Sequence, residues 1–401
     1  MENRTGLLTN AVIWFGVAIS VSEIEAGISI ANTTSSISMW TALILGHILG
    51  GLLLFLVGYM GAKVRMNAMQ LTQSTFSKYG SKFFATLNVM QLVAWVAVLN
   101  AQGASAINSL NLPISTPAIC ILLAVLIAIY VHVGLKRISK ITTAIMIILT
   151  ILLAILSIRL WYINPSNIPS ITGIPAASNL SFWNIFEISI AMPISWLPVI
   201  SDYTKDVEKP FMATFLSSLA YTIASLWMYV IGIEIAHIGV GVTIAQAILL
   251  ANLGVSGIII VVLSTITTNF MAANSAGQSA NVIYNKLNPK TVGIIVSLLS
   301  AILAISGIMN YYINFLYLIA SVFAPMAAVL LVSYYLTSNT RENIRVWSWN
   351  MFSWLAGFVV YNITISMDSI ILGPTLLAII VSAALAYIGI LFDRSFFKYE
   401  H

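Results

Sequence analysis

The stretch FGVAISVSEIEAG, Phe15–Gly27, lies inside an apolar run that is otherwise long enough to cross a membrane. It nevertheless contains Ser20, Ser22, Glu23 and Glu25. A carboxylate near the centre of a transmembrane helix costs roughly 3 kcal/mol or more, so such a group usually faces a cavity, a partner or a transported ligand. We therefore interpret the stretch as a transmembrane segment interrupted at mid-membrane, where its free backbone groups and side chains meet a small solute and a cation.

The composition around this stretch is that of a membrane protein. Of the 401 residues, 60% are hydrophobic and only 7% are charged, whereas soluble domains contain about 25% charged residues. Apolar runs of about 20 residues, the length of a helix that spans roughly 30 Å of hydrocarbon, recur along the whole chain. A transmembrane barrel is not favoured, because its strands would alternate apolar and polar residues. We expect an all-α polytopic membrane protein that forms a single membrane transport domain over residues 1–401.

Several classes of function are excluded by what the sequence lacks. The formal net charge of +5 comes from residues at the ends of apolar runs, which is not the pattern of a nucleic-acid-binding protein. Cys120 is the only cysteine, so an intrachain disulfide and a thiolate metal cluster are excluded. No cleavable signal peptide is expected, since the first apolar run is too polar at its centre. The motifs GxSxG, HExxH and GxxxxGK[ST] are missing, so we expect ion-coupled transport without a further cofactor, and no enzyme.

The apolar runs predict twelve spans in the lipid bilayer. Their approximate ranges are 9–32, 40–61, 83–108, 115–134, 140–163, 182–200, 211–234, 243–274, 291–308, 311–336, 347–363 and 370–391. With a cytoplasmic N-terminus, the lysines and arginines gather on the inner side, as the positive-inside rule requires. These are Arg4, Lys63, Arg65, Lys78, Lys82, Lys136, Arg137, Lys140, Lys205, Lys209, Lys286, Lys290, Arg341, Arg345, Arg394 and Lys398. Only Arg159 lies outside, so we expect a multi-pass protein of the plasma membrane with both termini in the cytoplasm.

The sixth span, EISIAMPISWLPVISDY, contains Pro193 and Pro198. Proline removes a backbone donor and clashes with the carbonyl four residues earlier, which predicts a break or a strong kink near Ser195–Trp196. Spans 1 and 6 then open two successive five-span units, and an odd number of spans inverts the second unit relative to the first. Paired interrupted helices in corresponding positions indicate a transporter's mid-membrane site. The units are a first repeat of about 9–163, a second repeat of about 182–336, and two additional packing helices of about 347–391.

Two other spans carry polar side chains that can serve a small solute or an ion. In the third span, Gln91 and Trp95 are four residues apart and share one helix face, offering hydrogen bonds and a stacking surface to a planar ring. In the eighth span, Ser264–Asn269 is a dense run of hydroxyls and amides, and oxygen ligands suit hard cations. The alternative for both is helix packing through interhelical hydrogen bonds.

Four other features are interpreted without a role in transport being assigned. Glu187 either pairs with a polar neighbour or lies at the membrane interface. His47, inside the second span, is expected to make a helix contact, with a proton relay as the alternative. The mixed-sign stretch 202–208 is expected to be a solvated cytoplasmic loop, and the outer connection Trp161–Leu180, rich in Pro, Ser and Asn, is expected on the surface.

Five stretches of the chain resemble the nucleobase-cation-symport-1 family, whose members include cytosine permease. They are WFGVAISVSEIEAG (14–27), GHILGGLLLFLVGYMGAK (46–63), LNVMQLVAWVAVL (87–99), SIAMPISWLPVISDYT (189–204) and STITTNFMAANSAG (264–277). The chain is most similar to the CytX-type branch of that family, which is assigned to hydroxymethylpyrimidine, the thiamine precursor. The resemblance implies a LeuT-like fold of inverted five-helix repeats with broken helices 1 and 6, and transport by alternating access.

The resemblance also implies where substrate and ion bind. Members of the family stack a planar heterocycle between aromatic residues of the third and sixth helices, and sodium-coupled members hold Na⁺ with carbonyls of the first helix and hydroxyls of the eighth. We assign substrate binding to Ser22, Glu23, Gln91, Trp95, Ser195, Trp196, Thr265 and Asn269. The Na⁺ site falls at Gly16, Ile19, Ser264, Thr267 and Thr268.

The departures from cytosine permease favour another pyrimidine. Met192 and Pro193 stand where that protein's sixth helix is more polar, and Glu23 stands in the first-helix break. A carboxylate accepts a hydrogen bond from an amino group, and a protonated carboxyl also donates one to a ring nitrogen, so Glu23 suits an aminopyrimidine. Glu25, two residues further, is expected to point away and receives no role.

These observations predict a secondary transporter that imports hydroxymethylpyrimidine by Na⁺ symport. The alternatives are a cytosine, other nucleobase or hydantoin permease, a proton-coupled version, a facilitator channel and a membrane-embedded enzyme.

Overall fold

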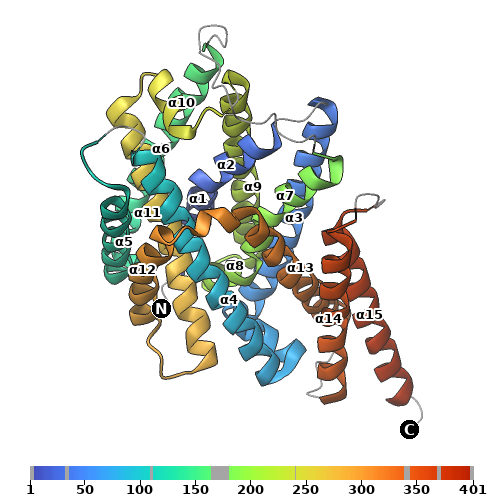
Figure 1. The fold of residues 1–401 in the computed structure, drawn as a ribbon. Coiled ribbons are helices and arrows are strands. Elements are labelled where there is room, and N and C mark those ends of the chain that lie inside the picture. Colours follow the sequence, from blue (N-terminus) through green and yellow to red (C-terminus); the bar gives the residue numbers. More distant parts are fainter. Residues whose placement is uncertain are drawn as a thin grey trace.

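The computed structural model describes residues 4–31, 36–108, 112–163, 180–239, 241–337, 344–367 and 372–397 (Figure 1). The described residues are almost entirely helical, with one isolated parallel bridge between Thr5 and Val207. The first eight helices are α1 (Leu7–Ala18), α2 (Val21–Ile30), α3 (Ser36–Val64), α4 (Ala68–Asn108), α5 (Thr116–Val133), α6 (Leu135–Trp161), α7 (Phe182–Ser195) and α8 (Leu197–Thr204). The others are α9 (Pro210–Ile238), α10 (Ile244–Leu250), α11 (Gly254–Ile283), α12 (Pro289–Ile305), the 3₁₀ turn η2 (Ile308–Tyr311), α13 (Tyr312–Leu336), α14 (Ile344–Thr364) and α15 (Pro374–Phe397).

The helices confirm an all-α membrane protein and are compatible with twelve spans. Among the described residues, nine segments are long and apolar enough to cross a membrane, and the bent pair α1 and α2 makes ten. The 17-residue α12 and the 21-residue α14 complete a set of twelve when each is counted as one span. Large apolar side chains are exposed along the outer faces of these helices, which is the surface that lipid requires.

Both interrupted spans are present, and they differ in degree. α1 and α2 meet at an angle of 52° across Ile19 and Ser20. α7 and α8 are separated by Trp196 alone and together make one continuous span. The prediction of a break near Ser195–Trp196 is therefore confirmed as a local interruption, whereas the first span is sharply bent.

The predicted eighth span, 243–274, was wrong at both ends. Thr243 and Gln246 form a capping box that begins the short helix α10, and this helix ends at Leu250. Asn252 and Gly254 then adopt positive φ angles of 53° and 36°, which turn the chain before α11 begins. α11 continues to Ile283, so the polar run lies near its middle. The predicted span joined α10 and α11 because both helices are apolar and the hydrophobic pattern does not show the turn between them.

The third span also begins earlier than predicted. α4 starts at Ala68, and its first part is set off by Ser77, whose φ of 67° and ψ of 174° are not helical. The carboxylate oxygen Oδ1 of Asp202 accepts a hydrogen bond of 2.9 Å from the Ala68 N–H. Asp202 therefore belongs to α8 and caps α4, which corrects its assignment to a solvated loop.

Some sequence predictions lie outside the described residues. This holds for 164–179 of the outer connection and for the positions of Arg341 and Lys398. The division into two repeats and the membrane sidedness of the termini stay predictions.

Arg65 and Arg159, which the sequence places on opposite sides of the membrane, contact different parts of the fold. Arg65 donates hydrogen bonds of 2.7 Å to the carbonyls of Lys205 and Val207, next to the bridge that Val207 makes with Thr5. Arg159, the one residue expected on the opposite side, donates a bond of 2.7 Å to the carbonyl of Ala251, beyond α10. α10 lies at the top of Figure 1. Arg159 thus holds the connection after α10, whereas Arg65 holds the connection after α8.

The additional helices α14 and α15 lie side by side at one edge of the molecule (Figure 1). Trp354 of α14 donates a hydrogen bond of 3.0 Å to the Val322 carbonyl of α13. Glu187 of α7 accepts bonds from the Thr375 N–H, at 3.0 Å, and from the Thr375 hydroxyl, at 2.5 Å. Glu187 therefore pairs with a polar neighbour and ties the start of α15 to the core.

α2 and α9 approach each other through two glycines. A Cβ on Gly232 would lie against the Ile24 carbonyl oxygen and 2.8 Å from the Gly27 Cα. A Cβ on Gly27 would lie 2.8 Å from the Tyr229 Cα. Backbone stands on both sides of this contact, so neither partner can rotate away. Small residues let membrane helices approach to this extent.

We predict that Gly232→Ala lowers stability by about 1–3 kcal/mol, because the added methyl group forces α2 and α9 apart. The measurement is the thermal unfolding of detergent-purified protein. Gly6→Ala is the matched control, since a Cβ there meets nothing within 4 Å. An unfolding temperature of Gly232→Ala equal to that of the control would contradict this packing.

Candidate functional site

The bend between α1 and α2 leaves backbone groups without helical partners. α1 ends at Ala18, Ile19 has φ −76° and ψ 86°, and Ser20 is extended. Ser20 starts α2 by accepting a hydrogen bond of 3.3 Å from the Glu23 N–H. Two carbonyl oxygens, those of Val17 and Ile19, point out of the helix at the bend and bond to side chains of α11.

α11 supplies hydroxyl groups at this point. The Ser264 hydroxyl donates a hydrogen bond of 2.8 Å to the Ile19 carbonyl. The Thr268 hydroxyl lies 3.4 Å from the Val17 carbonyl oxygen and 3.5 Å from that of Ile19. Four oxygen atoms from two helices thus meet at the bend, and oxygen ligands are those that a hard cation takes. The Val17 carbonyl was missed in the sequence, where the family resemblance implied Gly16 instead.

The two other members of the predicted cation set lie differently. The Thr267 hydroxyl donates to the Leu263 carbonyl of its own helix at 2.8 Å. Gly16 faces the side chain of Met146, and with Thr267 it lines a small cavity of about 20 Å³. The structure therefore brings Ile19, Ser264 and Thr268 together and places Gly16 and Thr267 at this neighbouring cavity.

At the second interruption, amides of α4 bond to backbone carbonyls of α7 and α8. The Gln91 amide donates a hydrogen bond of 3.1 Å to the Ser195 carbonyl, and the Asn88 amide donates one of 3.0 Å to the Pro198 carbonyl. Gln91 also donates to Asn88 Oδ1 at 2.8 Å. The Ser195 hydroxyl donates to the Met192 carbonyl of its own helix at 2.6 Å. Gln91 and Ser195, both assigned to the substrate, are thus neighbours.

The two tryptophans expected to stack on a ring have different aromatic neighbours. Trp196 packs edge-on against Trp14, with ring centroids 5.9 Å apart. Trp95 packs edge-on against Phe315, at 5.3 Å, and against Tyr312, at 6.4 Å. Trp14 is fully buried and was missed in the sequence, although it starts the stretch WFGVAISVSEIEAG.

Several buried polar atoms near these helices have no hydrogen-bond partner among the described residues. Among them are Trp14 Nε1, Gln91 Oε1, Trp95 Nε1, Thr265 Oγ1 and both Oδ1 and Nδ2 of Asn269; others on the same helices and on α8 are Asn10 Oδ1, Asn100 Oδ1, Gln102 Nε2, Asp202 Oδ2 and Ser275 Oγ. Asn269 is completely buried. An unsatisfied buried polar group costs about 1–3 kcal/mol, so a set of them calls for water or a ligand. Four of the residues assigned to the substrate belong to this set.

The packing of α4 against α11 places Thr265 and Asn269 on the face of α11 that α4 covers. A Cβ on Gly103 of α4 would lie 2.5 Å from Thr265 Oγ1, and Asn88 donates a hydrogen bond of 2.8 Å to Ser279. Asn269 is one turn from Thr265 on the same face of α11, so it also faces α4. Gln91 and Trp95 lie on α4 between Asn88 and Gly103.

Ser22 and Glu23 point to different helices. The Ser22 hydroxyl donates to Gln102 Oε1 on α4. The Glu23 carboxylate accepts bonds from the Tyr221 hydroxyl, at 2.9 Å, and from the Ser225 hydroxyl, at 2.8 Å, both on α9. Contact between Glu23 and a substrate therefore stays a prediction. The polar stripe of α9 at helical spacing, Ser218, Tyr221 and Ser225, was the sequence signal for this contact.

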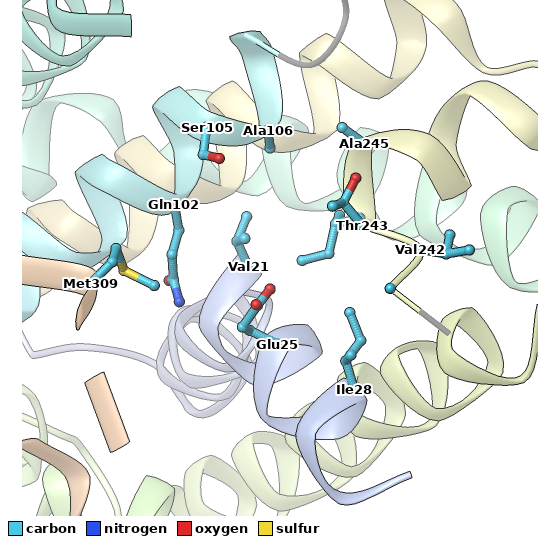
Figure 2. A pocket seen from close by; sticks show the side chains of 12 residues that line it. Val21, Glu25, Ile28, Gln102, Ser105, Ala106, Val242, Thr243, Ala245 and Met309 are labelled. Atoms are coloured by element: carbon cyan, nitrogen blue, oxygen red, sulfur yellow. The ribbon is translucent and has the colours of Figure 1, made fainter. Parts of the chain in front are cut away.

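A larger cavity, of about 340 Å³, lies where α2, α4 and the start of α10 meet (Figure 2). Val21 and Glu25 of α2 face Gln102 of α4 and Thr243 across it. We call it the outer cavity. Its volume is that of a small-molecule pocket. Glu25, which received no role from the sequence, lines this space, whereas Trp95 and Trp196 line neither it nor the cavity beside Gly16.

Comparison with known proteins gives relatives over most of the chain. No protein-family profile matches it. The cytosine permease of Escherichia coli K12 is 21% identical over 366 residues, covering 88% of this chain and 83% of the permease. The putative purine-cytosine permease YxlA of Bacillus subtilis 168 is 23% identical over 370 residues, covering 83% of this chain and 76% of the relative. These relatives are permeases and not enzymes, in agreement with the interpretation of the chain as a transporter.

A solved structure shares the fold. Mhp1, a nucleobase-cation-symport-1 family transporter in a closed conformation with bromovinylhydantoin bound, superimposes with a TM-score of 0.75 at 17% identity, covering 98% of this chain and 93% of Mhp1. The fold that the sequence resemblance implies is thereby confirmed, while the CytX-type branch stays a prediction. The chain is similar to the cytosine permeases over most of its length and has the fold of a nucleobase-cation-symport-1 transporter.

Proposed function

We propose that the protein imports a small aromatic heterocycle across the plasma membrane by cation symport with alternating access. The observation that carries this proposal is the set of buried, unpartnered polar atoms on α4 and α11 beside two interrupted helices. Interrupted helices beside a mid-membrane site are characteristic of secondary transporters. The similarity to cytosine permeases and to a hydantoin-bound transporter supports a flat nitrogen heterocycle as the substrate.

Hydroxymethylpyrimidine is the substrate that we propose, with cytosine as the alternative. Asn269 offers an amide donor and an amide acceptor, and Gln91 offers a free carbonyl oxygen. An aminopyrimidine presents the complementary pair, an amino donor beside a ring-nitrogen acceptor. A substrate that also reached Glu23 would displace the Tyr221 or the Ser225 hydroxyl, because each holds one carboxylate oxygen.

Na⁺ is the coupling ion that we propose. The carbonyls of Val17 and Ile19 and the hydroxyls of Ser264 and Thr268 are uncharged oxygen ligands that fit a hard monovalent cation. An ion at this place would hold the end of α1 against α11. Because α2 starts directly after this point, the ion would favour one orientation of the bent span over another. A ligand shifts such an equilibrium only by binding the two states unequally.

We predict that radiolabelled hydroxymethylpyrimidine accumulates in proteoliposomes when an inward Na⁺ gradient is imposed. An equal gradient of choline serves as the control, and unlabelled cytosine tests the alternative substrate by competition. Accumulation that is equal with choline would remove Na⁺ as the coupling ion. Equilibration without accumulation would indicate a facilitator.

We predict that Ser264→Ala raises the Na⁺ concentration for half-maximal uptake about tenfold, because one oxygen ligand of the cation is lost. Thr150→Val is the matched control, since the Thr150 hydroxyl also bonds a carbonyl, that of Met146 at 2.7 Å, but lies on α6. The measurement is the Na⁺ dependence of initial uptake. An unchanged dependence in Ser264→Ala would place the ion elsewhere.

We predict that Asn269→Leu weakens substrate binding at least about tenfold and leaves the thermal stability of the substrate-free protein unchanged or raised. The variant removes two buried polar atoms that have no partner among the described residues, so it removes a cost together with a ligand contact. The measurement is the shift in unfolding temperature with increasing substrate. Asn100→Leu is the contrasting control, because the Asn100 amide bonds to Cys120 and Ser300, and its loss should destabilise the protein without substrate.

A further inference from the structure

Glu23 belongs to a buried chain of hydrogen bonds that crosses three helices. Ser225 Oγ of α9 lies 2.8 Å from Glu23 Oε2 of α2 and 2.8 Å from His47 Nε2 of α3. Glu23 is 2% exposed, and Ser225 and His47 are fully buried. These residues are 24 to 202 positions apart in the chain, and the two contacts are as short as ordinary hydrogen bonds.

The other nitrogen of His47 is also fixed. His47 Nδ1 lies 2.7 Å from Ser189 Oγ of α7 and 3.1 Å from the Leu43 carbonyl oxygen. The Ser189 hydroxyl donates its hydrogen to the same Leu43 carbonyl, at 2.7 Å. Because Ser189 has one hydrogen and the carbonyl has none, Nδ1 must carry a hydrogen to complete these contacts. The proton that can vary is therefore the one on Nε2.

The hydrogens available to Ser225 decide how many protons the chain holds. A serine hydroxyl has one hydrogen, so it donates to one neighbour and accepts from the other. When Ser225 donates to an ionised Glu23, Nε2 must carry a hydrogen and His47 is positively charged. When Glu23 is protonated, it donates to Ser225, which donates to a bare Nε2, and His47 is neutral. Both arrangements contain one exchangeable proton, and both satisfy every contact.

The two arrangements interconvert by a balanced proton shift. The hydrogen on Nε2 passes to Ser225 Oγ while the Ser225 hydrogen passes to Glu23 Oε2, and no proton is gained or lost. Removal of the exchangeable proton has a different result. Glu23 then carries a negative charge while His47 is neutral, and one of the two contacts of Ser225 lacks a hydrogen. A buried uncompensated charge is far more costly than a buried neutral pair.

We propose that Glu23, Ser225 and His47 form a proton-binding site, that one proton is bound there when α2 packs against α9 as observed, and that its release accompanies the departure of α2 from α9 during transport. The protein thereby couples a proton to the movement of the bent span, at a place separate from the oxygen cluster of Ile19, Ser264 and Thr268. The coupling of the proton to transport rests on the proposed function, whereas the existence of the proton-binding site does not.

Other titratable groups surround the site, but none of those among the described residues supplies a positive charge that could take the place of the shared proton. On α9, the Tyr221 hydroxyl donates to Glu23 Oε1 at 2.9 Å, and the Tyr229 ring lies edge-on to His47 with centroids 4.8 Å apart. On α13, the Tyr312 hydroxyl donates to the Ser22 carbonyl at 3.1 Å. Glu25, on α2 itself, lines the outer cavity. The hydrogen bonds that Glu23 receives through its side chain thus come from hydroxyl groups, so the neutralising charge must come from the shared proton.

Infrared spectroscopy of the purified protein over a pH titration tests the site independently of transport. We expect the carboxyl bands of Glu23 and the imidazole bands of His47, identified by their loss in Glu23→Gln and His47→Gln, to change in one linked transition. We also expect Ser225→Ala to separate the transition into two. Strongly interacting groups titrate as a pair. If Glu23→Gln leaves the imidazole titration unchanged, the shared site does not exist.

Uptake measurements test whether proton binding at this site is coupled to transport. In proteoliposomes with equal Na⁺ on both sides, we expect an inward proton gradient to accelerate uptake of labelled hydroxymethylpyrimidine, and Ser225→Ala to reduce this response roughly tenfold. Ser218→Ala is the matched control, because Ser218 is also buried on α9 and bonds to α3, through the Gly51 carbonyl at 2.5 Å. A full response in Ser225→Ala would overturn the coupling. Absence of any uptake by the unmodified protein would count against the proposed substrate, while the infrared result still decides the site.

Discussion

Backbone groups that leave a helix inside hydrocarbon must find partners within the protein, and the core of this molecule is built on that constraint. Where α1 ends, hydroxyls of α11 reach the carbonyls of Val17 and Ile19. Where α7 ends, amides of α4 reach those of Ser195 and Pro198. Each interruption is thus completed by side chains from a continuous helix. This explains why the polar residues of α4 and α11 gather near their middles.

Polar side chains in this core differ in how many of their atoms are paired: both amide atoms of Asn88 have partners, whereas Asn100 is paired through its nitrogen and not through Oδ1. Asn88 and Asn100 are fully engaged as donors, to Ser279 and Ser300 among others, and fix how α4 packs against α11 and α12. Asn269, by contrast, is buried between the same helices with neither amide atom paired among the described residues. Satisfied groups define the scaffold, whereas an unsatisfied group can bind a substrate at little cost to the fold. The unpaired amide of Asn269 therefore fits the substrate site that we propose.

The carboxylates of the bent span have separate roles that follow from packing. Gly27 and Gly232 bring α2 and α9 into backbone contact, which places Tyr221 and Ser225 within reach of Glu23. Glu25, two residues further, points instead into the outer cavity (Figure 2). The close helix approach and the buried carboxyl therefore depend on each other, since without its α9 partners Glu23 would be an isolated charge.

The membrane-spanning helical class, the interruptions near Ile19 and Trp196, and the hydroxyl groups of α11 could be predicted from the sequence, because composition and proline positions act locally. The turn of Glu23 toward α9, the part of His47 in its chain of hydrogen bonds and the separation of α10 from α11 depend instead on how the helices pack. Helical periodicity tells which residues share a face, but not which helix covers that face. Partners such as Glu23 and Ser225, 202 residues apart, become neighbours only when the packed helices fix their rotation and depth.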